Sequence, residues 1–90
     1  MHAVVVSVSI SGDADPQEVV THLHENVVPA LSQAPGFMAG YWVRLEGNDR
    51  GRATIVFDSE DAARGARDQI QPAPGVTIES VDVGEVVANA

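Results

Sequence analysis

Cysteine is absent from this 90-residue sequence. Its absence excludes a disulfide framework, a thiolate zinc site, an iron–sulfur cluster and a cysteine nucleophile. A chain of this length builds one domain, residues 1–90, and small domains without disulfides or metals often gain stability from a partner subunit. Because a protein without cysteine is compatible with a reducing compartment, we expect a cytoplasmic location.

Positive charge is also scarce. Five arginines and no lysine stand against 13 acidic residues and give a formal net charge of −8. The arginines are scattered between positions 44 and 67 rather than clustered. Phosphate binding needs clustered basic side chains, so no nucleic-acid partner is expected, and the acidic surface is more simply explained as a source of solubility.

Long apolar runs are missing as well. The start of the chain, Met1-His2-Ala3, lacks a basic region and the segment turns polar at Ser7, so it does not resemble a signal peptide. No stretch approaches the roughly 20 apolar residues that span a membrane. We therefore expect no membrane partner.

The apolar residues of the sequence follow two different periodicities. Apolar residues alternate in four segments, which predicts strands, and recur every three or four residues in two others, which predicts helices. The expected elements are a strand at 3–10, a helix at 16–33, strands at 37–46 and 52–58, a helix at 60–70, and a last strand that begins at 76 and continues through 87. The β-α-β-β-α-β order predicts an α+β fold, a ferredoxin-like sandwich in which both helices cover one face of a four-stranded antiparallel sheet.

The first helix begins at a capping signal. Asp15-Pro16-Gln17-Glu18 combines a capping side chain, a proline at the first helical position and a glutamate three residues after the cap. Pro29 has no backbone N–H and is expected to kink the helix near Glu25. An apolar stripe is expected to face the core while His22 and Glu25 face away. Its members are Val20, Leu23, Val27, Ala30 and Leu31.

The uncovered face of the sheet predicts a partner subunit. The first and third strands carry apolar residues on both faces, since Val5 lies opposite its valine neighbours and Val56 lies opposite Ile55 and Phe57. A sheet face open to water does not need such residues. We expect a symmetric homodimer in which two subunits pack their open sheet faces together.

Three segments of the chain resemble a known family. Pro35-Gly36-Phe37, the pair Tyr41-Trp42 and the run from Val56 to Ala63 are similar to the dimeric α/β-barrel superfamily, particularly its antibiotic-biosynthesis-monooxygenase-like group. The resemblance covers nearly the whole chain and implies the ferredoxin-like dimer. It also implies a monooxygenase that acts on a small aromatic compound or a quinol without a cofactor.

One branch of that family degrades haem with an asparagine, a tryptophan and a histidine. This sequence departs at all three matching positions. Residues 5–9 contain no asparagine, Phe57 stands where the haem-degrading relatives carry tryptophan, and residues 60–70 contain no histidine. These departures argue against haem degradation.

Aromatic residues supply the candidate substrate-binding groups. In the second strand Phe37, Tyr41 and Val43 fall on one face, whereas Trp42 and Arg44 fall on the other. Either ring of the Tyr41-Trp42 pair is suited to line a pocket for a flat apolar ligand, but only one can line a given pocket, and packing in the core or interface is the alternative role. Arg44 is expected to bind an anionic substrate group or stack on the indole, with a surface ion pair as the alternative. Phe57, at the position matched through the resemblance, completes the substrate-binding set.

His24 is the candidate catalytic base. It flanks the apolar stripe, and an imidazole can exchange a proton near neutral pH. A partly exposed structural histidine is the alternative, and Asn26 flanks the stripe on its other side with the same two readings. His22 and His24 lie roughly 200° apart around a helix, so they cannot bind one metal ion together. We expect no metal site and no cofactor.

Two functions remain as hypotheses. The first is a cofactor-independent oxygenase that holds a small aromatic compound or quinol in an apolar cavity between sheet and helices. The second is a non-catalytic homodimer that binds a small apolar ligand or serves as a structural or regulatory module.

Overall fold

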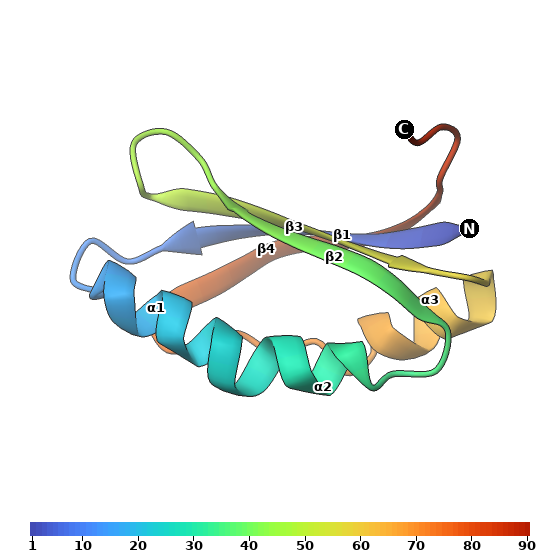
Figure 1. The fold of residues 1–90 in the computed structure, drawn as a ribbon. Helices are drawn as coiled ribbons and strands as arrows, with labels where there is room; N and C mark the ends of the chain where they lie inside the picture. Colours follow the sequence, from blue (N-terminus) through green and yellow to red (C-terminus); the bar gives the residue numbers. More distant parts are fainter.

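One antiparallel sheet carries all the helices on a single face (Figure 1). The computed structural model describes all 90 residues. Along the chain the elements are β1 (His2–Ile10), α1 (Pro16–His22), a π turn η1 (Leu23–Val27), α2 (Val28–Ser32), β2 (Phe37–Arg44), β3 (Arg50–Phe57), α3 (Glu60–Arg67) and β4 (Val76–Glu85). The strands pair antiparallel in the order β2-β3-β1-β4. The expected ferredoxin-like α+β fold is confirmed.

Both helical segments begin at side-chain caps. The Asp15 carboxylate accepts a hydrogen bond from the N–H of Gln17 at 2.9 Å, at the start of α1. The Ser59 hydroxyl accepts one from the N–H of Ala62 at 3.2 Å, at the start of α3. Each cap satisfies a backbone donor that has no partner within its own helix.

A π turn interrupts the first helix where the sequence predicts a disturbance. The N–H of Val28 bonds to the carbonyl of Leu23, five residues back, within η1. Pro29 follows this bond and has no N–H to offer the carbonyl of Glu25. The helix continues through α2, but the wider turn rotates the residues that follow it.

The core lies between the sheet and its helices. Phe57, Ile55 and Val4 are the largest fully buried side chains, and α3 adds two buried alanines. The ring of Phe57 packs edge to face on that of Phe37, with 6.2 Å between the ring centroids. Burial of these apolar groups is the main favourable term in forming the sandwich.

A bulge near the start of β2 corrects one expectation about its faces. Phe37 pairs with Phe57, but Ala39 pairs with the next residue of β3, Val56, so one extra residue is inserted between them. Phe37 therefore shares the helix-covered face with Trp42. Its expected place on the Tyr41 face is wrong, because strict alternation fails where a bulge adds a residue.

Three elements end at least two residues earlier than the sequence predicts, and the first is β2, which stops at Arg44 rather than at 46. The second predicted helix stops at Arg67 rather than at 70, since Gly65 weakens it and the following segment contains two prolines. β4 stops at Glu85, after which the N–H of Val86 bonds to the carbonyl of Met1 at 3.0 Å. None of the helices has the length and apolar character needed to cross a membrane.

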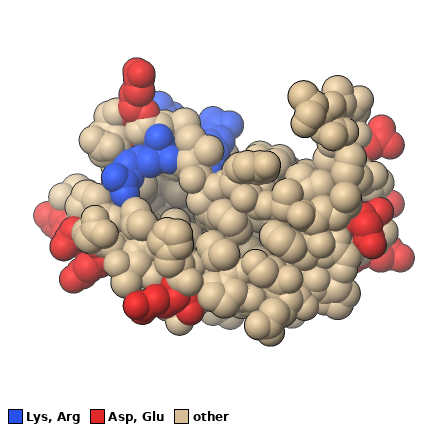
Figure 2. All heavy atoms as spheres, viewed as in Figure 1, with Lys and Arg blue, Asp and Glu red and all other residues tan.

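Helices cover only one of the two faces of the sheet. On the face without helices, Tyr41 is 66% exposed and Val43 is 52% exposed. In the side view of Figure 2, the arginines of the β2–β3 hairpin gather at one end of the molecule, and the middle is mainly uncharged. The uncovered face therefore exposes large apolar side chains, whereas charge gathers toward the ends of the molecule (Figure 2).

Candidate functional site

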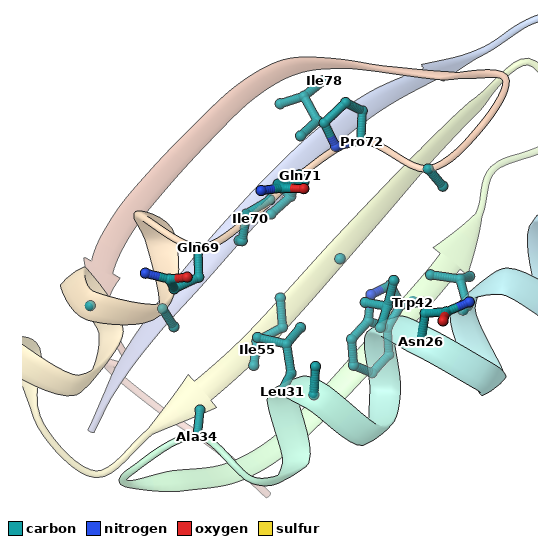
Figure 3. A pocket seen from close by; sticks show the side chains of 18 of the residues that line it. Asn26, Leu31, Ala34, Trp42, Ile55, Gln69, Ile70, Gln71, Pro72 and Ile78 are labelled. Carbon is teal, nitrogen blue, oxygen red and sulfur yellow. The ribbon is translucent and has the colours of Figure 1, made fainter.

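An open cavity of about 1110 Å³ lies between the sheet and the helices. Its floor comes from β1 and β3, one wall from α1, η1 and α2, and the opposite wall from α3 and the segment after it (Figure 3). Of its 28 lining residues 17 are hydrophobic, so it suits a mainly apolar ligand. The volume lies just above the roughly 300–1,000 Å³ common for small-molecule pockets, which leaves room for a large ligand. The floor residues are Val6, Val8, Ala53 and Ile55.

Trp42 is the aromatic residue of the cavity. It lies on the helix-covered face of β2, and Figure 3 shows it on the side of the cavity formed by β2 and the first helix. A Cβ placed on Gly40, two residues earlier, would lie 2.8 Å from the indole ring. The absence of a side chain at position 40 therefore lets the indole lie against the strand instead of filling the cavity.

A histidine and an asparagine form the polar part of the first wall. His22 ends α1 and Asn26 lies in η1, and both line the cavity. The Asn26 side-chain nitrogen Nδ2 lies 3.3 Å from Nδ1 of His22 and 3.4 Å from the carbonyl oxygen of His22. The imidazole is thus tied to its own helix through Nδ1, while Nε2 makes no hydrogen bond within the protein.

The side of the helix that faces the sheet agrees with the expected stripe at Leu23, Val27, Ala30 and Leu31, which line the cavity, and differs from it within α1. Val19, not Val20, is the buried valine of α1, and His22 lines the cavity rather than facing away. A stripe that starts one residue earlier includes position 22, and the π turn then keeps Asn26 on the same side. Sequence reasoning missed His22, although its spacing of three residues from Val19 and four from Asn26 was a usable signal.

His24, the candidate base, is exposed and does not line the cavity. It flanks the apolar stripe, as expected, but does not reach the cavity between helix and sheet. A catalytic role for His24 has no support from its placement.

In the opposite wall, α3 supplies small residues, and the segment after it adds Gln69, Ile70, Gln71 and Pro72. Ala62, Gly65 and Ala66 of α3 line the cavity, and a Cβ built on Gly65 would meet no atom within 4 Å. Two acidic side chains, Asp58 and Asp61, also belong to the lining, whereas no arginine does. This wall supplies space and negative charge but no aromatic ring or imidazole.

The three other predicted substrate-binding residues lie outside this cavity. Tyr41 projects from the uncovered face of the sheet, opposite to Trp42. Phe57 is 0% exposed and belongs to the core. Arg44 lines a separate hollow of about 300 Å³ beside the β2–β3 turn, where its Nη2 donates to the carbonyl of Pro16 at 3.2 Å. Of the predicted set, the structure brings only Trp42 to the cavity.

Comparisons with solved structures show a likeness in fold. No family model matches this sequence, and neither does any curated protein. The haem degrader MhuD from Mycobacterium tuberculosis, solved with two haems bound in its active site, has a similar structure with a TM-score of 0.70 and 20% sequence identity. The match covers 100% of this chain and 99% of MhuD. A variant of MhuD with two manganese protoporphyrin IX molecules per active site gives a TM-score of 0.69 at 20% identity, with 100% and 98% of the two chains covered.

Proposed function

We propose that this protein binds a flat aromatic ligand of porphyrin size, with haem the first to consider, and acts on it as a monooxygenase-like enzyme. The observation that carries the proposal is the apolar cavity of about 1110 Å³ beside Trp42, which is larger than a small phenol or quinol needs. A fold shared over the whole length with a haem degrader adds support.

The chemistry of the lining fits a porphyrin macrocycle. The apolar floor matches the ring, and the indole of Trp42 can contact its face. No arginine lines the cavity, and Asp58 and Asp61 repel carboxylates at the α3 end. The propionate groups of a haem would therefore point out through the open side into water.

An asparagine, a tryptophan and a histidine also occur together in the lining, as Asn26, Trp42 and His22. These are the residue types of the haem-degrading branch, although they stand at other positions of the fold. Bound haem would supply the oxygen chemistry, and the protein would bind and orient the macrocycle. The base role expected for His24 is no part of this proposal, because its side chain is exposed.

A neutral small aromatic compound or quinol is the second candidate ligand. The lining contains two acidic side chains and neither arginine nor lysine, which favours a ligand without negative charge. Such a ligand would occupy only part of the cavity. A cofactor-independent oxygenase and a non-catalytic binding protein both fit this reading.

Fluorescence titration tests the proposal directly, because Trp42 is the only tryptophan of the chain. We expect metal-free protoporphyrin IX and ferric haem to quench its emission with one saturable transition. The matched control is Tyr41→Phe, which alters a ring on the other face and is expected to change nothing. Absence of quenching by both porphyrins, with quenching by a neutral quinol, would contradict the porphyrin assignment in favour of the second candidate.

Turnover is tested separately from binding. With oxygen and a reductant, we expect the haem absorbance of the complex to decay faster than that of free haem. Gly65→Leu, which narrows the cavity, is expected to slow the decay. Stable haem absorbance in a saturated complex would leave a binding protein and remove the enzymatic part of the proposal.

We also propose that two copies pair through the uncovered face of the sheet. Tyr41 and Val43 are exposed there, and Val5 and Val56 lie on the same face. Covering such side chains removes apolar surface from water. Sedimentation is expected to give a dimer for the natural chain and a monomer for Tyr41→Asp, whereas Glu79→Ala on the edge strand is expected to stay dimeric. A monomeric natural chain at micromolar concentration would refute the pairing.

A further inference from the structure

Only a few side chains can hold the iron of a haem. Proteins use histidine, cysteine, methionine and tyrosine for this purpose. The chain has no cysteine, and among the residues that line the cavity His22 is the sole member of the other three types. The residues of these types that lie outside the cavity are Met1, His2, His24, Met38 and Tyr41.

His22 also has the arrangement of a metal-binding imidazole. Its Nδ1 faces the Asn26 amide at 3.3 Å, which leaves Nε2 as the ring nitrogen without a partner. In metal sites the histidine commonly donates its second N–H to an oxygen acceptor, and this bond fixes the orientation of the ring and raises its basicity. Asn26 carries such an oxygen, Oδ1, on the same amide group.

The Asn26 amide must turn over for this role. Its Nδ2 now lies near Nδ1 and the carbonyl oxygen of His22, at 3.3 and 3.4 Å, and both contacts are longer than a typical hydrogen bond. Asn26 is exposed, so rotation of its amide meets little resistance. A metal–imidazole bond outweighs the two weak contacts that the rotation gives up.

The position of His22 suits a ligand that lies against the first wall. It ends α1, directly before the π turn, and π turns inside helices often accompany functional sites. Trp42 lines the same cavity from β2, and α3 on the opposite wall presents the small residues Ala62, Gly65 and Ala66. The imidazole is thus the only side chain of a type that coordinates haem iron in a mainly apolar cavity, which also has two carboxylates, Asp58 and Asp61, at its α3 end.

From these observations, and resting on the proposed haem binding, the geometry points to His22 as the iron ligand. Its Nε2 coordinates the iron of a haem in the cavity, and Asn26 is the positioning residue that accepts a hydrogen bond from Nδ1–H through Oδ1. Coordination replaces a water or solvent ligand on the iron and transfers no electron.

The test compares ferric haem with metal-free protoporphyrin IX, which has the same ring but no iron. For the natural chain we expect haem to bind at least about tenfold more tightly and to show the absorption and spin-resonance signature of a nitrogen ligand. His22→Ala is expected to bind the two porphyrins equally and to lose that signature. His24→Ala, two residues away and outside the cavity, is the matched control and is expected to behave as the natural chain does.

Added imidazole distinguishes coordination from a structural defect. Free imidazole is expected to restore the nitrogen-ligand spectrum of haem in His22→Ala, because it can occupy the space left by the His22 ring and coordinate the iron. Asn26→Asp is expected to retain the spectrum, since a carboxylate accepts Nδ1–H, whereas Asn26→Leu is expected to weaken haem binding roughly 10-fold and leave protoporphyrin binding unchanged.

The outcomes separate this assignment from the proposed function. If neither porphyrin binds the natural chain, the proposed function fails. If both porphyrins bind, and haem keeps its affinity and spectrum in His22→Ala, porphyrin binding stands and the iron-ligand assignment is overturned. Loss of protoporphyrin binding in His22→Ala would also overturn it, because the imidazole would then act on the ring and not on the iron.

Discussion

The two walls of the cavity differ in what they contribute. The wall of α1, η1 and α2 carries an imidazole, a side-chain amide and a π turn, whereas α3 presents alanines and a glycine. Small residues on α3 hold that helix close to the sheet and leave space above the floor. The imidazole of the cavity is therefore on the longer helix, whereas the small residues of the shorter one determine how large a ligand can be.

The largest effect, a loss in the free energy of unfolding, is expected in the floor of the cavity beneath both walls. Ile55 lies in the floor and is 1% exposed, so Ile55→Ala should lower the free energy of unfolding by about 2–5 kcal/mol. Ile55→Val, the matched control, should cost only about 0.5–1.5 kcal/mol. Urea denaturation measures both. A loss below 1 kcal/mol for the alanine variant would show that the floor can collapse.

The size of the cavity depends on the α3 wall. Gly65→Leu should narrow the cavity and weaken porphyrin binding about tenfold, which corresponds to about 1.4 kcal/mol. Gly65→Ala adds one methyl group in open space, should leave affinity unchanged, and should stabilise the helix by about 0.5–1 kcal/mol. Titration and thermal unfolding of both variants separate the two effects. Equal affinity in the leucine variant would mean that the ligand does not contact α3.

Removal of each helix cap allows the stability of the two helical walls to be compared. Asp15→Ala and Ser59→Ala each remove a side-chain acceptor from a helix start, at a cost of about 1 kcal/mol. The two caps belong to different helices with no shared partner, so the losses should add in the double variant. Hydrogen exchange should show faster exchange in the helix that lost its cap. Faster exchange in both helices would indicate that the walls unfold together.

The smallest effect on stability is expected in β2, the strand beside the first wall. Gly40→Ala places a methyl group 2.8 Å from the Trp42 ring, so the indole must move. We expect a shift in the emission maximum of Trp42 and a severalfold loss of porphyrin affinity, with little loss of stability. Gly84→Ala, at a position with no atom within 4 Å of the new methyl group, is the control. An unchanged emission spectrum in Gly40→Ala would contradict the close packing.

The sequence by itself determined the elements and their order. Alternating valines mark β1, the Asp15-Pro16 cap marks the start of α1, and Pro29 marks the disturbed turn, because each signal acts through neighbours in the chain. The identity of the six main segments, and with it the ferredoxin-like fold, follows from such local rules. The sequence also established that Tyr41 and Trp42 face opposite sides of the sheet, since successive side chains of a strand alternate between its two faces.

Only the tertiary structure decided which of these residues share a site. The cavity takes Trp42 rather than Tyr41 because the helices cover one face of the sheet, and it takes His22 rather than His24 because the helix docks with Val19 inward. The bulge after Phe37 reverses the face of that ring. These choices depend on contacts between segments far apart in the chain, where a rotation by one residue costs little locally but changes which side chains are buried.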